Sequence, residues 1–304
     1  MSARVAERES QIVLGLDPDP EALWPGAVAG ASAGGTPAER AALAVLEHCR
    51  AVLDATAEAC VAVKPQLARF ELLGAPGWAA LEAVIAHAHL CGLLVIADGK
   101  RGDIDVTAQA YAGALFGGRD TPFGALSGLG ADMATVNPLM GVDAIAPFIA
   151  GAREAGAGVL VLVRTSNPGA SDVEDLSLAD GGAVWERIAA IVGRLGAEAI
   201  GESGLSDVGA VVGATEPAHL ARARELMPQA VFLLPGVGAQ GGRVEDLAPA
   251  FAPGRAGGLV SASRSIVNAH LAGRGGSSGG DPAGAARAEA ERLRETAWEL
   301  STVR

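Results

Sequence analysis

The segment LLVIADGKRGD, residues 93–103, joins a run of branched apolar residues directly to a cluster of charges. The run lacks the strict apolar–polar alternation of a half-exposed strand, so it predicts a strand over 93–100 that is buried on both faces. Strands of this kind belong to parallel sheets covered on both sides. The segment therefore predicts an α/β fold in which one strand end carries Asp98 and Lys100, with Asp103 just beyond.

The same strand pattern recurs along the chain. Seven further short runs end in polar residues, Gly or Pro, at 11–17, 60–66, 133–138, 158–166, 208–215, 231–238 and 258–264. Helical patterns lie between them, from the capping box Thr36-Pro37-Ala38-Glu39 to about Thr56, and near 77–90, 103–116, 142–154, 182–200, 216–226 and 243–252. This alternation predicts a closed (β/α)8 TIM barrel with eight parallel strands. An open doubly wound sheet is the alternative, but no GxGxxG follows the first strand to support it.

The length of 304 residues suits either two average domains or one barrel with additions. Because the strand count closes only over the whole chain, we expect a single barrel domain over 1–272. The stretch GRGGSSGG has the composition of a flexible linker, which we place at 273–281. Residues 282–304 are then expected to form a C-terminal helix packed on or near the barrel.

Composition excludes several classes of protein. Half of the residues are hydrophobic and 19% are charged, which supplies a large core and excludes a mostly disordered chain. The net charge of −12 disfavours nucleic acid and anionic membranes as partners. The three cysteines, Cys49, Cys60 and Cys91, form no CxxC pair and are expected to be buried, reduced thiols. With no signal peptide and no membrane-spanning run, we expect a soluble, cytoplasmic protein.

Barrel enzymes carry their active sites at the carboxyl ends of the strands. The first three predicted strands bring Asp17, Lys64, Asp98 and Lys100 to one mouth. Mutual pairing of these charges would keep Lys100 cationic and able to donate a proton. An aspartate held beside a substrate carboxylate would disfavour the ground state by like-charge repulsion. The alternative is a network of ion pairs that only closes the rim of the barrel.

The last strands predict an anion site. The turn at 235–242 is rich in glycine, and Arg264 follows the final strand, where barrels commonly bind phosphate. Backbone N–H groups, Gln240 and Arg264 could all donate to an anion. The alternative is that these glycines serve only tight turns.

A long polar loop from Ser166 to about Gly182 has the length of a lid. Ser166 could bind a planar amide ring or merely cap the loop. Asn137, at the end of the fourth strand, is either a ligand contact or a turn residue.

The histidines do not indicate an active site, and the sequence contains no metal-binding pattern. All five histidines fall in helical stretches away from the strand ends, and His87 and His89, two residues apart, point to different sides of a helix. No zinc motif and no Ser–His–Asp pattern is present, so we expect neither a metal nor a cofactor.

Several of these segments together resemble the orotidine 5′-phosphate decarboxylase family, in particular its longer, type 2 group. The resemblance is carried by GLDP (15–18), VKP (63–65), DGKRGDI (98–104), TSNPGA (165–170), LPGVGAQGG (234–242) and Arg264. It implies a TIM barrel that converts orotidine 5′-monophosphate to UMP in de novo pyrimidine biosynthesis, without metal or cofactor.

The resemblance also implies residue roles. Lys100 would donate the proton to the pyrimidine C6, Asp98 would face the departing carboxylate, and Lys64 and Asp103 would complete the charged network. The implied substrate contacts are Asp17 and Lys64 with the ribose, Ser166 with the pyrimidine, and Gln240 and Arg264 with the phosphate. Asn137, Pro235 and Gly238 are further expected substrate contacts.

Homodimers of this family place their sites at the subunit interface. The resemblance implies that Asp103, Ile104 and Thr107 reach the partner's site, Asp103 and Thr107 from one face of a helix. This chain departs from the shorter members by Asp105, where they often have Pro, and by its long loop near Arg164.

Two other functions compete with this one. A sugar-phosphate decarboxylase or aldolase of the same superfamily would share the Asp-x-Lys-x-x-Asp pattern and depend on a divalent metal. The second competing function is that of a scaffold or binding protein, built on a barrel without catalytic activity.

Overall fold

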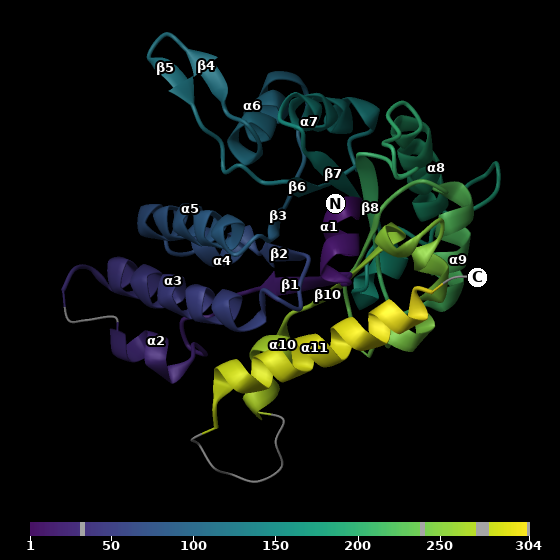
Figure 1. The fold of residues 1–304 in the computed structure, drawn as a ribbon. Helices are drawn as coiled ribbons and strands as arrows, with labels where there is room; N and C mark the ends of the chain where they lie inside the picture. Colours follow the sequence, from purple (N-terminus) through teal and green to yellow (C-terminus); the bar gives the residue numbers. More distant parts are fainter. Residues whose placement is uncertain (31–33, 238–240, 272–279, 303–304) are drawn as a thin grey trace.

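The computed structural model describes residues 1–30, 34–237, 241–271 and 280–302. Eight parallel strands close into a barrel in the order β1-β10-β9-β8-β7-β6-β3-β2 (Figure 1). Their bounds are β1 Ile12–Leu16, β2 Ala62–Pro65, β3 Leu94–Arg101, β6 Met133–Val136, β7 Gly158–Arg164, β8 Val208–Val212, β9 Phe232–Leu234 and β10 Gly258–Ala262. The predicted TIM barrel is confirmed.

Helices cover the outside of the barrel. The main ones are α3 Pro37–Thr56, α5 Ala75–Leu90, α6 Asp105–Leu115, α7 Val142–Glu154, α8 Val184–Gly196 and α9 Pro217–Leu226. The predicted capping box opens α3, because Thr36 Oγ1 accepts from the Glu39 N–H and Glu39 Oε2 accepts from the Thr36 N–H. Six of the predicted strands are buried along their whole length, as expected under such a cover.

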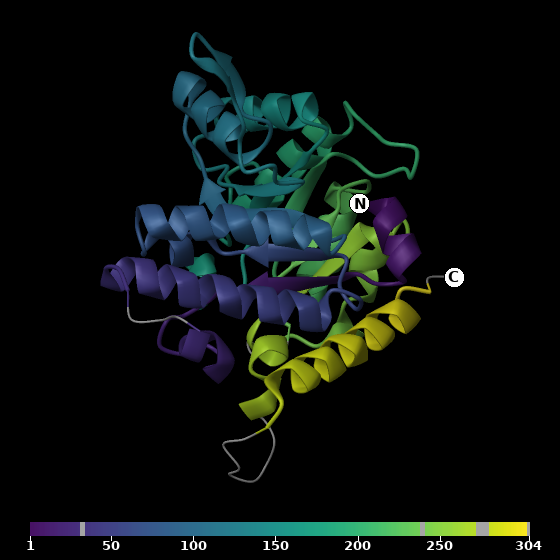
Figure 2. The ribbon, with the colours of Figure 1, turned by 60° about the vertical axis from the view of Figure 1, so that its left-hand side comes forward.

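The structure adds short elements that the sequence patterns did not predict. They are the helices α1 Ser2–Arg8, α2 Pro25–Gly30, α4 Leu67–Glu71 and α10 Arg264–Val267, and the antiparallel pair β4 Arg119–Thr121 and β5 Gly124–Leu126. The β4–β5 hairpin projects from the body of the molecule beside α6 (Figures 1 and 2). Its tip residue, Phe123, is 99% exposed.

The C-terminal helix α11, Pro282–Leu300, lies along the outside of the barrel next to α3 (Figures 1 and 2). Its buried face is built from small side chains and one leucine: Ala286, Ala290, Leu293 and Ala297. Most of the proposed linker falls outside the described residues, so the division of the chain stays a prediction.

Two helix predictions need correction. Over 243–252 the chain forms the short 3₁₀ turns η2 Val244–Asp246 and η3 Ala248–Phe251 instead of a helix. Pro249 explains this, because it lacks an N–H and its ring clashes with the preceding helical turn. The helix predicted from 103 begins at Asp105, since Ile104 is extended and Asp103 Oδ1 accepts the Ile104 N–H.

The end of the barrel opposite the strand carboxyl ends is closed by apolar packing. Val5 of α1 packs there with Val61, Met133 and Leu205, and Trp298 of α11 lies against the same cluster. All three cysteines are free, as predicted, but Cys91 is only partly buried. No helix in the described ranges is both long and apolar enough to cross a membrane.

Candidate active site

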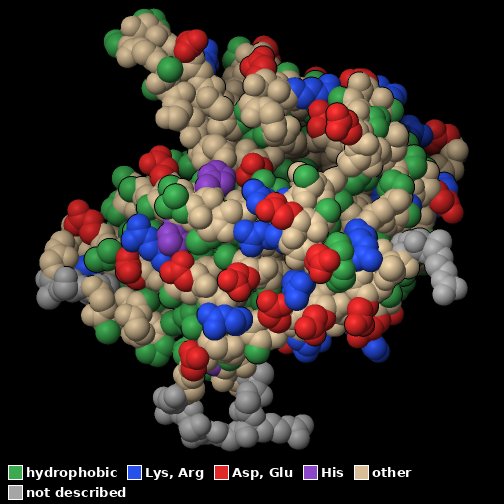
Figure 3. Space-filling model, viewed as in Figure 1, with side chains coloured by type: hydrophobic (Ala, Val, Ile, Leu, Met, Phe, Trp, Pro, Cys, Tyr) green, Lys and Arg blue, Asp and Glu red, His purple; other side chains and the backbone are tan. Residues whose placement is uncertain are grey.

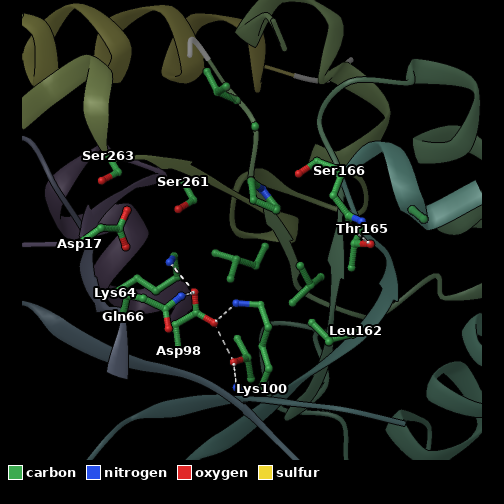
Figure 4. Close-up of a pocket in the computed structure, with 18 of the residues that line it drawn as sticks. Asp17, Lys64, Gln66, Asp98, Lys100, Leu162, Thr165, Ser166, Ser261 and Ser263 are labelled. Atoms are coloured by element: carbon green, nitrogen blue, oxygen red, sulfur yellow. Dashed lines mark hydrogen bonds and ion pairs between the residues drawn. The ribbon is translucent and has the colours of Figure 1, made fainter. Parts of the chain in front are cut away.

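A cavity of about 990 Å³ opens at the carboxyl ends of the strands. Many of the predicted site residues line it: Asp17, Lys64, Asp98, Lys100, Asn137, Ser166, Pro235 and Arg264. Figure 4 shows Asp17, Lys64, Asp98 and Lys100 grouped on one side and Ser166 on the other. The barrel has thus gathered into one cavity residues that are spread over most of the sequence.

Asp98 is the centre of the charged side. Its Oδ2 accepts from Lys64 Nζ at 2.6 Å and from Gln66 Nε2 at 3.2 Å. Its Oδ1 accepts from Lys100 Nζ at 2.7 Å and from Thr135 Oγ1 at 2.9 Å. The carboxylate is 4% exposed, so four donors replace the water it has lost.

These contacts set the charge of Asp98. Burial alone would raise its pKa, but the ammonium groups of Lys64 and Lys100 outweigh burial and lower the pKa to about 2. Asp98 is therefore ionised at neutral pH. The two lysines differ in access, because the Lys64 side chain is 10% exposed and that of Lys100 is 46% exposed. Of the two lysines, Lys100 is the more accessible to a ligand in the cavity.

A backbone irregularity directs Lys100 into the cavity. The pairing of β3 with β6 shifts register between Ala97 and Arg101, and Lys100 has a φ of 47°. A left-handed conformation costs a non-glycine residue about 1–2 kcal/mol. The Lys100 N–H donates to Thr135 Oγ1 at 2.9 Å, which holds the bulge against the neighbouring strand. Backbone strain of this kind clusters at functional sites, and here it falls on the lysine that is accessible from the cavity.

Other predicted residues fall elsewhere. The lining formed by the described residues does not include Asp103, Ile104 or Thr107, and Ile104 is 49% exposed. The predicted one-turn spacing of Asp103 and Thr107 is wrong, because Asp103 precedes α6. The predicted substrate contacts Gly238 and Gln240 lie outside the described residues.

The rest of the rim is built from loops and strand ends. Arg264 begins α10 two residues after the end of β10, and its exposed side chain lines the cavity. Asn137 Oδ1 accepts from the Leu139 N–H at 3.0 Å, so this residue caps a turn while it also lines the cavity.

An ion-pair network holds the loop that presents Ser166. Arg164 donates through Nε and Nη2 to the two carboxylate oxygens of Asp175, at 2.8 and 2.9 Å. Glu174 accepts from the N–H of Thr165 and from its Oγ1, both at 2.8 Å. The loop is thereby tied to the end of β7 on both sides of Ser166. We call Arg164, Glu174 and Asp175 the loop latch.

The sequence patterns missed several residues of the cavity. Gln66 and Ser263 directly follow β2 and β10, so the strand-end rule that found Lys64 and Arg264 could have found them. Thr135 and Ser261 lie inside strands and gave no such signal.

The prediction that histidines lie away from the site is wrong for His48, which lines the cavity from α3. Burial and the nearby His270 lower its pKa to about 4, and its Nδ1 accepts the Trp24 N–H. His48 is therefore neutral at pH 7 and serves to anchor the segment that follows β1.

Comparison with known proteins identifies the family of this chain. The model of the orotidine 5′-phosphate decarboxylase / HUMPS family matches residues 10–273. The chain belongs to this family. The match spans all eight barrel strands, from β1 to β10, and therefore every element that lines the cavity.

Individual members of the family are similar over most of their length. The orotidine 5′-phosphate decarboxylase of Deinococcus radiodurans is 47% identical over 245 residues, 80% of this chain and 81% of the relative. That of Roseiflexus castenholzii is 38% identical over 94% of this chain and 92% of its own. The solved structure of Leishmania donovani OMP decarboxylase superposes with a TM-score of 0.74 at 31% identity, covering 100% and 99% of the two chains.

Proposed function

We propose that this protein decarboxylates orotidine 5′-monophosphate to UMP in pyrimidine biosynthesis, with Lys100 as the proton donor. The observation that carries the proposal is the buried, ionised Asp98 held between Lys64 and the accessible Lys100. Membership of the decarboxylase family supplies the substrate class.

The reaction needs a cation beside the carbon that loses carbon dioxide. The C6–carboxylate bond breaks and its electron pair stays on C6. The Lys100 ammonium then delivers a proton to C6, so that a C–H bond replaces the C–C bond, and Lys100 regains a proton from solvent. Asp98, fixed beside Lys100, repels the substrate carboxylate and loses that repulsion as carbon dioxide leaves.

The remaining cavity residues bind and orient the nucleotide. In the proposed complex Asp17 and Lys64 contact the ribose, Ser166 the pyrimidine edge and Arg264 the phosphate. All four line the cavity, as do Pro235 and Asn137. We include Gln240 as a phosphate contact and Gly238 as a further substrate contact on the family resemblance alone. Binding energy from the phosphate is used at the distant reacting carbon, as is general for enzymes with remote binding groups.

The proposed reaction uses neither metal nor cofactor. Both oxygens of Asp98 are already engaged by side-chain ammonium groups at 2.6 and 2.7 Å, so lysines provide the positive charge at the reacting centre. The competing sugar-phosphate activity would depend on a divalent metal, which makes chelation a direct test.

The proposed active form is a homodimer in the cytoplasm. Asp103, Ile104 and Thr107 lie at the surface near the exposed Val106, where a second copy could receive them. Asp103 would then join the charged network of the partner subunit.

The test is the ultraviolet loss of orotidine 5′-monophosphate by the purified protein in excess EDTA, repeated in D₂O. We expect rapid conversion to UMP that carries deuterium at C6. Activity only on a sugar phosphate with added Mg²⁺ would assign the protein to the metal-dependent relatives. Inactivity in both assays would leave the scaffold function.

A further inference from the structure

Three potential metal ligands lie together on the outer surface, where helices α3 and α5 end. Asp54 comes from α3, His87 from α5, and Cys91 from the residue that caps α5. Figure 3 shows histidine side chains at the surface over these two helices, among acidic and basic groups. The cluster is separate from the cavity at the strand ends and takes no part in the proposed reaction.

The arrangement follows from helix geometry. His87 and Cys91 are four residues apart, and the Cys91 N–H donates to the His87 carbonyl at 3.0 Å, so both side chains lie on one face of α5. Asp54 meets that face from α3, with its Oδ1 at 2.7 Å from His87 Nε2 and 3.8 Å from Cys91 Sγ. His87 thus shares a helix face with Cys91, whereas His89 lies on a different side of α5, as the two-residue spacing predicts.

We propose that Asp54, His87 and Cys91 bind one zinc ion that fastens α3 to α5. One carboxylate, one imidazole and one thiolate form a donor set typical of zinc, with a water molecule in the fourth position. All three donor atoms lie within 4.8 Å of one another. In a tetrahedral zinc site neighbouring donors lie about 3.3–3.6 Å apart, so side-chain movements of about 1 Å complete the site.

The surroundings favour a cation. Asp54 lies in the last turn of α3 and His87 in the last turn of α5, where the helix dipole attracts positive charge. Arg8 faces the cluster with an opposing charge. Its guanidinium donates to the carbonyls of Ala57 and Cys91, which holds the two helix ends in register.

Cys91 is the thiol of this chain that a metal ion in solution can reach. Zinc binding forms a Zn–S bond and releases the thiol proton to solvent. Cys49 and Cys60 are fully buried, whereas Cys91 is partly exposed and reachable from water.

The test uses Co²⁺ as a spectroscopic probe on the full-length protein, purified without a histidine tag. We expect a thiolate-to-cobalt charge-transfer band and the visible bands of tetrahedral cobalt, saturating at one ion per chain and removed by Zn²⁺. Zinc should also raise the melting temperature. Cys91→Ser should abolish the charge-transfer band and the zinc-dependent shift in melting temperature, and His87→Gln should weaken binding at least tenfold.

The same helix provides a matched control. His89 pairs with Asp132 at 3.2 Å, another histidine–aspartate contact, and lies on a different face from His87 and Cys91. His89→Gln should leave the cobalt spectrum and the zinc affinity unchanged. A charge-transfer band that persists in Cys91→Ser, or that is absent from the wild-type protein, would overturn the proposal.

Discussion

The two ends of the barrel both bury charge, and they satisfy it in opposite ways. At the mouth, Asp98 is paired with Lys64 and Lys100, and Lys100 remains open to the cavity. At the other end, Arg224 of α9 is 9% exposed and donates to backbone carbonyls, among them those of Ala230 at 2.7 Å and Ala250 at 2.6 Å.

The hydrogen-bond partners of Arg224 show that it serves stability, in contrast to Lys100. Arg224 also donates to the carbonyls of Met227 and Gly257 and stacks on Phe232 with its guanidinium carbon 3.8 Å from the ring centre. Burial lowers its pKa to about 10, so it stays charged at neutral pH. Its Nη1 and Nη2 groups donate to backbone carbonyls of the fold, whereas the Lys100 ammonium is accessible to a substrate. The comparison separates a site for reaction from a site for stability.

The largest expected effect is on the reaction, from Lys100→Ala. Loss of the proton donor should lower kcat by at least about 10⁴-fold, the upper range for general acid catalysis. Turnover of orotidine 5′-monophosphate measures the loss of kcat. Calorimetric titration with UMP measures binding, which should be largely retained. The melting temperature should change little, since Lys64 still pairs with Asp98. A variant that keeps a tenth of the activity would remove Lys100 from the chemistry.

At the other end of the barrel, we expect a substitution to lower stability and leave activity unchanged. Arg224→Met should lower the free energy of unfolding by about 3–4 kcal/mol, because several buried carbonyls lose their donor. Denaturant unfolding measures this loss, and the kcat of the protein that remains folded should be unchanged. Arg224→Lys keeps the positive charge but loses the planar guanidinium. Its free energy of unfolding should lie between those of Arg224→Met and the wild type. Equal stability of Arg224→Met and wild type would contradict the role assigned to Arg224.

At the cavity, Arg264→Ala should affect both substrate binding and the chemical step, unlike Lys100→Ala. Loss of a charged donor to phosphate should lower kcat/KM by about 10²-fold, through both a higher KM and a lower kcat. Steady-state kinetics with added inorganic phosphite or phosphate tests the assignment, since a free anion should compete with the wild-type enzyme but not with the variant. Normal kinetics in Arg264→Ala would place the phosphate elsewhere.

The smallest effect is expected from the loop latch. Asp175→Asn removes one carboxylate charge from Arg164 and should raise KM about 5-fold to 10-fold, with a smaller change in kcat, because Ser166 is less firmly placed. Asp172→Asn lies in the same loop, outside the latch, and is the matched control with wild-type kinetics expected. Similar values for the two variants would show that the latch has no part in positioning the loop.

The local sequence was sufficient to predict the fold class and many of the residues that line the cavity. Buried strands have a distinctive apolar run, and a closed parallel barrel brings all their carboxyl ends to one mouth, so Lys64, Asp98 and Arg264 could be placed there from strand order alone. The prediction failed where a single residue overrides a pattern, as Pro249 does in the segment predicted as a helix over 243–252.

The sequence by itself determined which residues carry charge and at which strand ends they lie, because hydrophobic periodicity is a local property of the chain. Only the tertiary structure decided which of them meet. The register of neighbouring strands, which pairs Gly15 with Lys64 and bridges Gln66 to Asp98, sets the depth of each charge in the mouth. The contact of α3 with α5 likewise joins Asp54 to Cys91. Such contacts depend on barrel closure and helix packing, which no short segment encodes.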